Sequence, residues 1–344
     1  MSYINRNHAN LLDSDPDELA GIVLELGEKK FRAKQLFQWL SKGTGSFDEM
    51  RNLPKAFRER LAEKYTIDLP KIVTEQLSKT DGTRKCLFEF PDGSRVESVF
   101  MKYSYGNSIC ISSQVGCRMG CTFCASTLGG LERSLTAGEM LGEVLAMRNR
   151  TGEPINHVVV MGMGEPFDNY ENLSRFIRLI HNPNGYGLSL RNITVSTSGL
   201  IPGIERFADG FPQVNLAVSL HAPNDEIRRR SMPVARKYDY QSLMEACRAY
   251  TEKTGRRITF EYALIRGLND SVRDAEELAG WLRGWQTHVN LIPLNPVDGT
   301  GYSAPDRETI RRFRETLEKH HVAVTVRRTL GADIDAACGQ LRLR

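Results

Sequence analysis

The stretch SICISSQVGCRMGCTFCAS (residues 108–126) joins a short apolar and β-branched run to three closely spaced cysteines. The alternation in SICIS, residues 108–112, predicts a β-strand. Cys117, Cys121 and Cys124 follow this strand, and a glycine precedes each of the first two. We therefore expect the three thiols to lie on a loop at the carboxyl end of a strand, which is where barrels built from βα units place their active sites.

Strands and helices alternate beyond this stretch as far as residue 326. Further β-branched runs predict five more strands, at residues 157–162, 192–197, 214–220, 258–264 and 289–294. Amphipathic segments between them, such as residues 137–150 and 240–253, predict helices. Strands separated by helices form parallel sheets, and six βα units are too few to close an eight-stranded barrel. We predict an α/β fold, a partial (βα)6 barrel over residues 108–326.

The regions outside the barrel have other patterns. Residues 1–67 carry three short amphipathic segments and predict a small helical module. Residues 68–107 change to period two around the turn signal PDG, which predicts a β-hairpin or meander extension. Residues 327–344 form a C-terminal tail. Two cysteines outside these motifs, Cys86 and Cys247, are predicted to be core thiols without chemistry.

Composition limits the class of protein. The chain has 344 residues, 40% hydrophobic and 26% charged, which is typical of a globular protein, and no run approaches the ~18 apolar residues of a membrane span. Its seven cysteines, an odd number, argue against a secreted disulfide scaffold, so we expect a cytoplasmic protein. The net charge of +4 does not by itself indicate nucleic acid. Basic residues concentrate in residues 28–39 and 228–237, which are either solvated faces or sites of phosphate contact.

The three clustered cysteines suit an iron–sulfur cluster better than zinc. A structural zinc site needs four ligands, and adding Cys110 gives a spacing that matches no common zinc site. Three thiolates can bind a cluster and leave one iron open for a substrate. The C-x3-C-x2-C spacing resembles the signature of the radical S-adenosylmethionine (SAM) superfamily, in which SAM chelates that iron. We predict that Cys117, Cys121 and Cys124 hold a 4Fe–4S cluster.

Polar motifs follow four of the later strands, where a bound SAM is expected. They are MGMGEPF (residues 161–167), STSG (196–199), SLHA (219–222) and NLIPLNP (290–296). The first resembles the GGE motif of radical SAM enzymes, and Glu165 within it could accept hydrogen bonds from the SAM amino group. His221, in the third, could instead be a core histidine with satisfied hydrogen bonds. Polar clusters at four strand ends together favour a binding site.

Nearly the whole chain resembles the bacterial radical SAM dual-specificity RNA methyltransferases, which methylate carbon 2 of adenine in 23S rRNA and in certain tRNAs. The matching motifs are FRAKQLFQWL, FDEMRNLPKAFRERL, DGSRVESVFM, CISSQVGCRMGCTFCAS, MGMGEP, VSTSG, NLAVSLHAP, LIPLNP and DIDAACGQL. The resemblance implies a 4Fe–4S cluster and two SAM molecules per turnover. It also implies 23S rRNA and tRNA as partners, a flavodoxin- or ferredoxin-type electron donor, and no membrane partner.

The resemblance also implies residue roles. The residues that would contact SAM are Gly164, Glu165, Ser196, Ser219, Leu220, His221 and Asn295. Cys338 would carry the methyl group, Cys110 would be the resolving thiol and Glu97 the proton acceptor. Carbon 2 of adenine is electron-poor, so it cannot attack the SAM methyl group as a nucleophile. A carbon radical formed on the S-methyl group can add to it instead. A Cys110–Cys338 disulfide would then release the product. From its strand alternation alone, Glu97 is expected on an exposed face.

Two alternatives remain from the sequence. A related resistance methyltransferase modifies carbon 8 of the same rRNA adenine, and there the motif reads GMGEA. Pro166 at that position here favours carbon 2. The other alternative, from a different class, is a non-catalytic RNA-binding module with a structural zinc.

Overall fold

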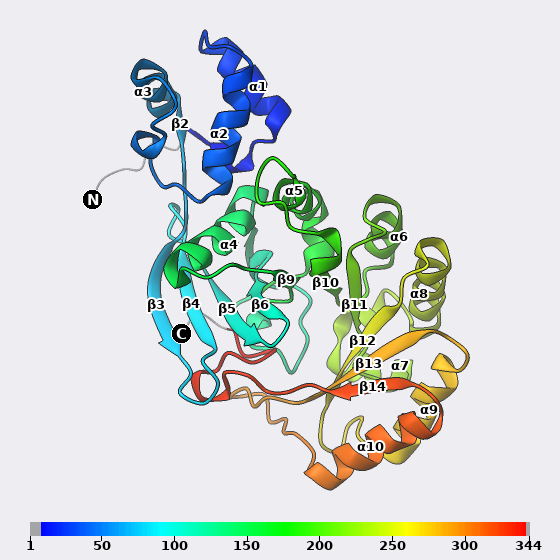
Figure 1. Ribbon diagram of the computed structural model, residues 1–344. Helices are drawn as coiled ribbons and strands as arrows, with labels where there is room; N and C mark the ends of the chain where they lie inside the picture. Colours follow the sequence, from blue (N-terminus) through cyan, green and yellow to red (C-terminus); the bar gives the residue numbers. More distant parts are fainter. Residues whose placement is uncertain (1–7, 342–344) are drawn as a thin grey trace.

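A ten-stranded sheet forms the centre of the molecule. The computed structural model describes residues 8–341, so the ends of the predicted helical module and tail, residues 1–7 and 342–344, lie outside the described residues (Figure 1). The strand order is β14-β13-β12-β11-β10-β9-β6-β5-β4-β3. In this order, each neighbouring pair of strands from β14 as far as β6 is parallel. Their bounds are β6 Gly106–Ile111, β9 His157–Val160, β10 Ile193–Thr197, β11 Asn215–Ser219, β12 Ile258–Leu264, β13 Thr287–Pro293 and β14 Ala323–Val326.

The predicted partial barrel is confirmed, with one strand more than expected. The six predicted strands correspond to β6 and β9 to β13, and the sheet ends at β14 and β3 without closing on itself. The prediction missed β14 because it has four residues at the sheet edge, none of them buried. A short, half-exposed edge strand lacks the apolar run that identified the others.

Helices cover the outer face of the parallel strands, as Figure 1 shows for the arc from α4 to α10. Their bounds are α4 Ala137–Thr151, α5 Tyr170–His181, α6 Ile201–Gly210, α7 Asp225–Ser231, α8 Tyr240–Thr254, α9 Val272–Leu282 and α10 Arg307–Lys319. In α5 the residues at helical spacing, Leu173, Phe176, Ile177 and Ile180, are fully buried. Burial of such stripes against the sheet builds the main core. Cys86 and Cys247 lie within it, fully buried, as predicted.

The β-extension continues the barrel sheet. Strands β3 (Lys71–Leu77), β4 (Arg84–Glu89) and β5 (Arg95–Tyr103) form an antiparallel meander, and β5 pairs antiparallel with β6. Val99 of β5 stands opposite Cys110 of β6. Since side chains alternate along a strand, Glu97, Val99, Met101 and Tyr103 share one face of β5. Val99, Met101 and Tyr103 line the barrel interior, so Glu97 faces inward as well.

The N-terminal module lies next to α4 and α5, the first helices of the outer layer (Figure 1). It contains α1 (Pro16–Glu25), α2 (Phe31–Ser41) and α3 (Lys55–Lys64), as predicted, and two short strands, β1 (Ala9–Asn10) and β2 (Tyr65–Thr66), which pair in parallel. The contact with α4 is close, because a Cβ atom on Gly138 would lie 2.7 Å from the backbone nitrogen of Asp13. Gly138 N donates to Asp13 Oδ1 at 2.6 Å, which fixes the module to the start of α4. Among residues 8–341, no helix is both long and apolar enough to cross a membrane.

Candidate functional site

A cavity of about 200 Å³ opens at the carboxyl ends of the parallel strands. Every site residue predicted from the sequence lines it except Glu97 and Leu220. The predicted residues it contains are Cys110, Cys117, Cys121, Cys124, Gly164, Glu165, Ser196, Ser219, His221, Asn295 and Cys338. The fold therefore brings together residues from the cysteine loop, five strands or strand ends, and the tail.

The cysteine loop is held at its base by a small ribbon of two strands, β7 (Gln114–Gly116) and β8 (Leu131–Ser134). Gly116 has a φ of +75°, and a Cβ atom there would lie 2.0 Å from the carbonyl oxygen of Gly130, so only glycine fits. Cys117 N donates to the same oxygen at 2.9 Å. Thr127 Oγ1 donates to the carbonyls of Cys121 at 3.2 Å and Cys124 at 2.9 Å. The loop backbone is thus fixed without using the thiols.

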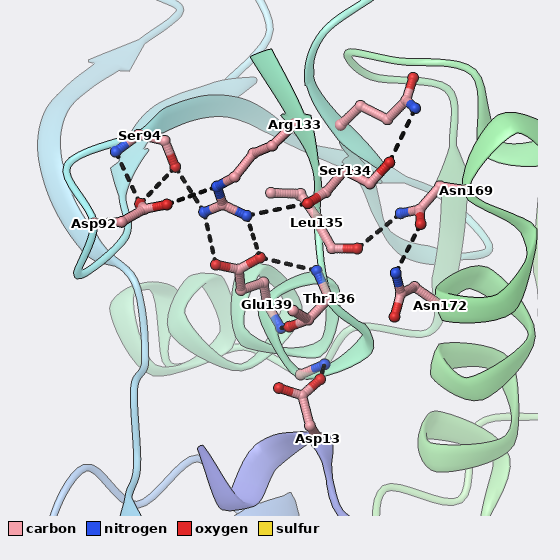
Figure 2. Close-up of polar contacts among 12 residues, drawn as sticks. Asp13, Asp92, Ser94, Arg133, Ser134, Leu135, Thr136, Glu139, Asn169 and Asn172 are labelled. Carbon is pink, nitrogen blue, oxygen red and sulfur yellow. Dashed lines mark hydrogen bonds and ion pairs between the residues drawn. The ribbon is translucent and has the colours of Figure 1, made fainter. Parts of the chain in front are cut away.

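Figure 2 shows how the ribbon is tied to its surroundings. Arg133 of β8 pairs with Glu139 in the first turn of α4 at 2.7 Å and with Asp92 of the β4–β5 turn at 2.6 Å. Its guanidinium also donates to Ser94 Oγ at 2.7 Å. One arginine therefore joins the base of the cysteine loop to the barrel helix and to the β-extension.

The three thiols suit a cluster rather than a single ion. Burial raises the pKa of Cys117 to about 12 and also raises the pKa of Cys121 and Cys124, and each of the three pKa values is raised further by a neighbouring cysteine thiol. Thiolates at these positions therefore need a strongly cationic partner. Within residues 8–341, no group of three His, Cys, Asp or Glu side chains is arranged around one metal ion. In a 4Fe–4S cluster each thiolate binds a different iron, so the donor set fits that group.

Glu165 is held between two strand ends. It is 3% exposed, its Oε1 accepts from Phe167 N at 3.0 Å and Thr197 Oγ1 at 2.8 Å, and its Oε2 accepts from Ser198 N at 2.7 Å. Burial raises the pKa of this carboxyl, and the hydrogen bonds act in the opposite direction. An ionised carboxylate has about four acceptor positions, so one is left for a ligand in the cavity. Gly164, with a φ of +100°, gives the close approach to Gln114 that sets this turn.

His221 lies against the cysteine loop as a neutral imidazole. Its backbone has a positive φ of 54°, and its ring meets Phe123 edge-on with centroids 5.1 Å apart. Burial lowers the pKa of His221 to about 3, with the cation of Arg228 adding to the effect. Since Nδ1 accepts from Ala263 N at 2.8 Å, the proton of the neutral ring is assigned to Nε2. The side chain is thus a hydrogen-bond donor lining the cavity.

Arg228 corrects one expectation. As part of the basic stretch 228–237 it was a candidate for phosphate contact, yet its side chain is fully buried. Its guanidinium donates to the backbone carbonyls of Ser198 at 2.6 Å, Leu220 at 3.2 Å and Ser219 at 3.4 Å. It therefore ties together the carboxyl ends of β10 and β11. The sequence gives no signal of which of the three adjacent arginines is buried. In the structure Arg228 is buried, and Arg229 and Arg230 are exposed.

The tail closes over the cavity as a strap, which we define as residues 327–341. Asn295 Nδ2 donates to Cys338 O at 3.1 Å, Ala125 N donates to Gly339 O at 2.8 Å, and Ser126 Oγ donates to Leu341 O at 2.9 Å. The strap is thereby fastened to the cysteine loop, and Cys338 lines the same cavity as Cys110. Burial raises the pKa of Cys110 to about 12, and the nearby Cys338 adds to this.

Glu97 is buried beneath the strap. The expectation of an exposed face from strand alternation is wrong, because the side chain is 1% exposed. Lys85 Nζ lies 3.1 Å from Glu97 Oε1 and also donates to Asp335 O of the strap at 3.3 Å. Lys85 and the strap cover the Glu97 carboxylate, which a two-residue period alone cannot reveal. Leu220 is also fully buried, and only its backbone lies at the strand end.

Among the charged residues of the cavity that escaped the sequence prediction, two form a pair. Arg327, at the start of the strap, lines the cavity with Glu261 of β12, and the two are 3.8 Å apart. The acidic groups beside it, Cys338 first and Glu261 also, raise the pKa of Arg327. Neither residue stands in a motif. A single charge within a strand or directly after one gives no signal that it faces inward.

Comparison with known proteins identifies the family of the chain. The chain matches the family models of the radical SAM superfamily over residues 111–281 and of the ribosomal RNA large subunit methyltransferase N-terminal domain over residues 9–67. Two probable dual-specificity RNA methyltransferases RlmN are similar over nearly their whole length. The protein from Alkaliphilus oremlandii is 54% identical over 97% of each chain, and that from Desulforamulus reducens is 50% identical over 100% of this chain and 99% of its own. The crystal structure of a radical SAM methyltransferase from Sphaerobacter thermophilus matches with a TM-score of 0.94 and 45% identity, over 98% of this chain and 100% of the other.

Proposed function

Because the chain belongs to the radical SAM dual-specificity RNA methyltransferases of the RlmN type, we propose that it methylates carbon 2 of adenine in 23S rRNA and in certain tRNAs. The chain is a radical SAM RNA methyltransferase, and its cofactors are a 4Fe–4S cluster and SAM. What we propose beyond this is the position methylated, the residues that act and their order of action. The presence of Cys110 and Cys338 in one cavity with the three-cysteine loop is the observation that carries the proposal.

Two thiols in one cavity support a relay through a methylated cysteine. The Cys338 thiolate takes the methyl group of a first SAM, which leaves as S-adenosylhomocysteine. This half of the cycle needs no RNA. Cys338 is only partly buried and lies beside the cation of Arg327, whereas Cys110 is deeply buried. The more accessible thiol is the better nucleophile at the start of the cycle.

The second half transfers the carbon to the base. One hydrogen atom moves from the S-methyl group to the 5′-deoxyadenosyl carbon of a second SAM, and the resulting carbon radical bonds to carbon 2. The base radical then gives up the proton on carbon 2 and one electron, which replaces the electron that opened the second SAM, and the Cys110 thiolate attacks the Cys338 sulfur. This breaks the bond between sulfur and the transferred carbon, which takes a proton and becomes the methyl group. The two thiols lose two electrons as the disulfide forms, and the second SAM gains two as it becomes methionine and 5′-deoxyadenosine. A dithiol reductant then restores the thiols.

Residues of the cysteine loop and of the strand ends are the proposed ligands of the two cofactors. We propose that Cys117, Cys121 and Cys124 hold the cluster, which when bound supplies the electron that opens the second SAM to a carbon radical. Glu165 retains one acceptor position for the SAM amino group. His221 offers its Nε2 proton to the same ligand, and the remaining proposed contacts are Gly164, Ser196, Ser219, Leu220 and Asn295.

Glu97 is the proposed acceptor of the carbon-2 proton. Its carboxylate pairs with Lys85, which also holds the strap, and neither side chain lines the cavity. Movement of the strap would uncover Glu97 at the time when the proton must leave. Until then the Glu97 carboxylate stays paired with Lys85.

The proposed partners are 23S rRNA, tRNA and a flavodoxin- or ferredoxin-type electron donor. The cytoplasm is the proposed location, because these RNAs reside there and because the cycle depends on reduced thiols. The experiment that tests the function is mass spectrometry of adenosine from 23S rRNA and tRNA treated with the holoenzyme and SAM. We expect 2-methyladenosine. An 8-methyl product would favour the carbon-8 alternative, and no methylated adenosine would contradict the proposal.

A further inference from the structure

A second cavity, of about 620 Å³, lies at the opposite end of the barrel. Residues near the amino ends of the parallel strands line it, together with the β5–β6 turn. We call it the vestibule and define it by six of these residues, Tyr103, Tyr105, Asn215, Arg256, Arg257 and His288. Its volume lies within the range of roughly 300–1,000 Å³ that small-molecule sites occupy, which is enough for a nucleotide.

The vestibule and the candidate site are two ends of one interior. Tyr103, Met161, Glu261 and Arg327 are among the residues that line both cavities. Along β13, His288 lines the vestibule. Ile292, four residues further and on the same face, lines the cavity of the candidate site. A ligand bound at the amino ends therefore lies on the same axis as Cys110 and Cys338.

The strap covers the open side of the barrel, between β14 and β3. Gly331 N donates to Asp81 Oδ2 at 2.9 Å, and Lys79 N donates to Asp333 Oδ2 at 3.0 Å. Figure 1 shows the strap running from β14 toward β3 and β4 and then back to the centre. The cysteine loop lies over the carboxyl end. A large substrate can therefore enter through the vestibule while the strap and the cysteine loop stay in place.

The chemistry of the vestibule suits single-stranded RNA. The rings of Tyr103 and Tyr105 stack with centroids 4.9 Å apart and planes at 10°, and Tyr105 is 66% exposed. An exposed aromatic face is a platform for an unpaired base. Arg257 is exposed beside it, and Arg256 is oriented by its hydrogen bond to Asn215 Oδ1. Two arginines and a stacking platform in one cavity are suited to a base and its flanking phosphates.

We propose that the vestibule binds an unpaired segment of the RNA substrate, with one base stacked on Tyr105 and a backbone phosphate at Arg256 and Arg257. From there the target adenine reaches the two thiols through the barrel interior. This inference rests on the proposed function, since it concerns how the RNA substrate reaches that site. Extrusion of the target base from its stack is what any chemistry on a base requires.

The test compares Tyr105→Ala, Tyr105→Phe and Arg257→Ala holoenzymes on a transcribed 23S rRNA fragment. Loss of a stacked base is worth about a tenfold or larger rise in KM, so we expect this for Tyr105→Ala, while Tyr105→Phe retains the ring and stays near wild type. Arg257→Ala should weaken binding and lower the dependence of log Kd on log salt by about one. Arg312→Ala, an exposed arginine on the outer helix α10, is the matched control for lost charge.

Self-methylation of Cys338, read by mass spectrometry without RNA, reports whether each variant is folded and loaded. If Tyr105→Ala binds and methylates the fragment with wild-type KM and Kd, the vestibule proposal is wrong. It is also wrong if the variants slow reduction by the electron donor while RNA binding is unchanged, because the arginines then serve that partner. Absence of RNA methylation by the wild-type enzyme would contradict the proposed function instead, and Kd for the fragment would still test the vestibule.

Discussion

Lys85 and Glu97 form a buried ion pair on neighbouring strands, with Lys85 Nζ 3.1 Å from Glu97 Oε1 and exposures of 4% and 1%. The same Nζ donates to Asp335 O of the strap, so one ammonium group joins the proposed proton acceptor to the segment that carries Cys338. A charge pair removed from water in this way is costly to break, because the partner left behind remains buried and charged.

Replacing Lys85 with Met should therefore destabilise the protein strongly. The expected loss in the free energy of unfolding is about 3–5 kcal/mol, because Glu97 is left without its ammonium partner. Adding Glu97→Gln should restore part of this loss, since a neutral amide tolerates burial better than a carboxylate. Urea denaturation of the two single variants and the double variant measures the coupling. Losses that simply add would show that the two side chains do not interact.

Replacing Cys338 with Ala should abolish RNA methylation and leave the cluster intact. The side chain lost is the proposed methyl carrier, and it is not among the three proposed cluster ligands. Methylated adenosine measured by mass spectrometry should fall to background, while the visible absorbance of anaerobically purified protein should match the wild type. The matched control is Cys247→Ala, which removes a fully buried core thiol that does not line the cavity. Methylation by the Cys338 variant would show that the tail thiol plays no part.

Replacing Cys110 with Ala should trap a covalent RNA–protein species. The proposed bond between carbon 2 and the Cys338 methylene can still form, but no thiol is left to attack the Cys338 sulfur and release the product. Denaturing gel electrophoresis with labelled RNA should show a shifted band that disappears after ribonuclease treatment. In the Cys110, Cys338 double variant the band should be absent. Normal turnover by the single variant would contradict the resolving role.

Local motifs were enough to predict the cysteine loop and the strand ends. Spacing within a few residues identified Cys117, Cys121 and Cys124, and the strand pattern placed Glu165 and His221 at the same edge, where the structure has them. These features depend on short stretches of chain whose chemistry is visible in the sequence.

What the sequence could not predict depends on contacts between distant segments. Glu97 is buried because Lys85 and the strap lie over it, and Arg228 is buried because three carbonyls at two strand ends accept its hydrogen bonds. A charged residue in a strand or a short helix has the same local pattern whether it faces water or a buried partner. Only the arrangement of the whole barrel separates the two cases.

Replacing Glu143 of α4 with Gln should change how stability depends on pH. Glu143 is fully buried, its Oε2 accepts from Ser112 N at 3.0 Å, and burial raises its pKa from 4.5 to about 8. The folded protein therefore retains a proton that the unfolded chain releases between these pH values. The contribution of Glu143 to stability is complete below pH 4.5 and falls as the pH rises to about 8, by about 1.4 kcal/mol per pH unit. The Gln variant is neutral throughout and lacks this loss. Urea midpoints at pH 5.5 and pH 8 should thus differ less for the variant than for the wild type, and an equal difference in both proteins would show that Glu143 is already ionised in the folded state.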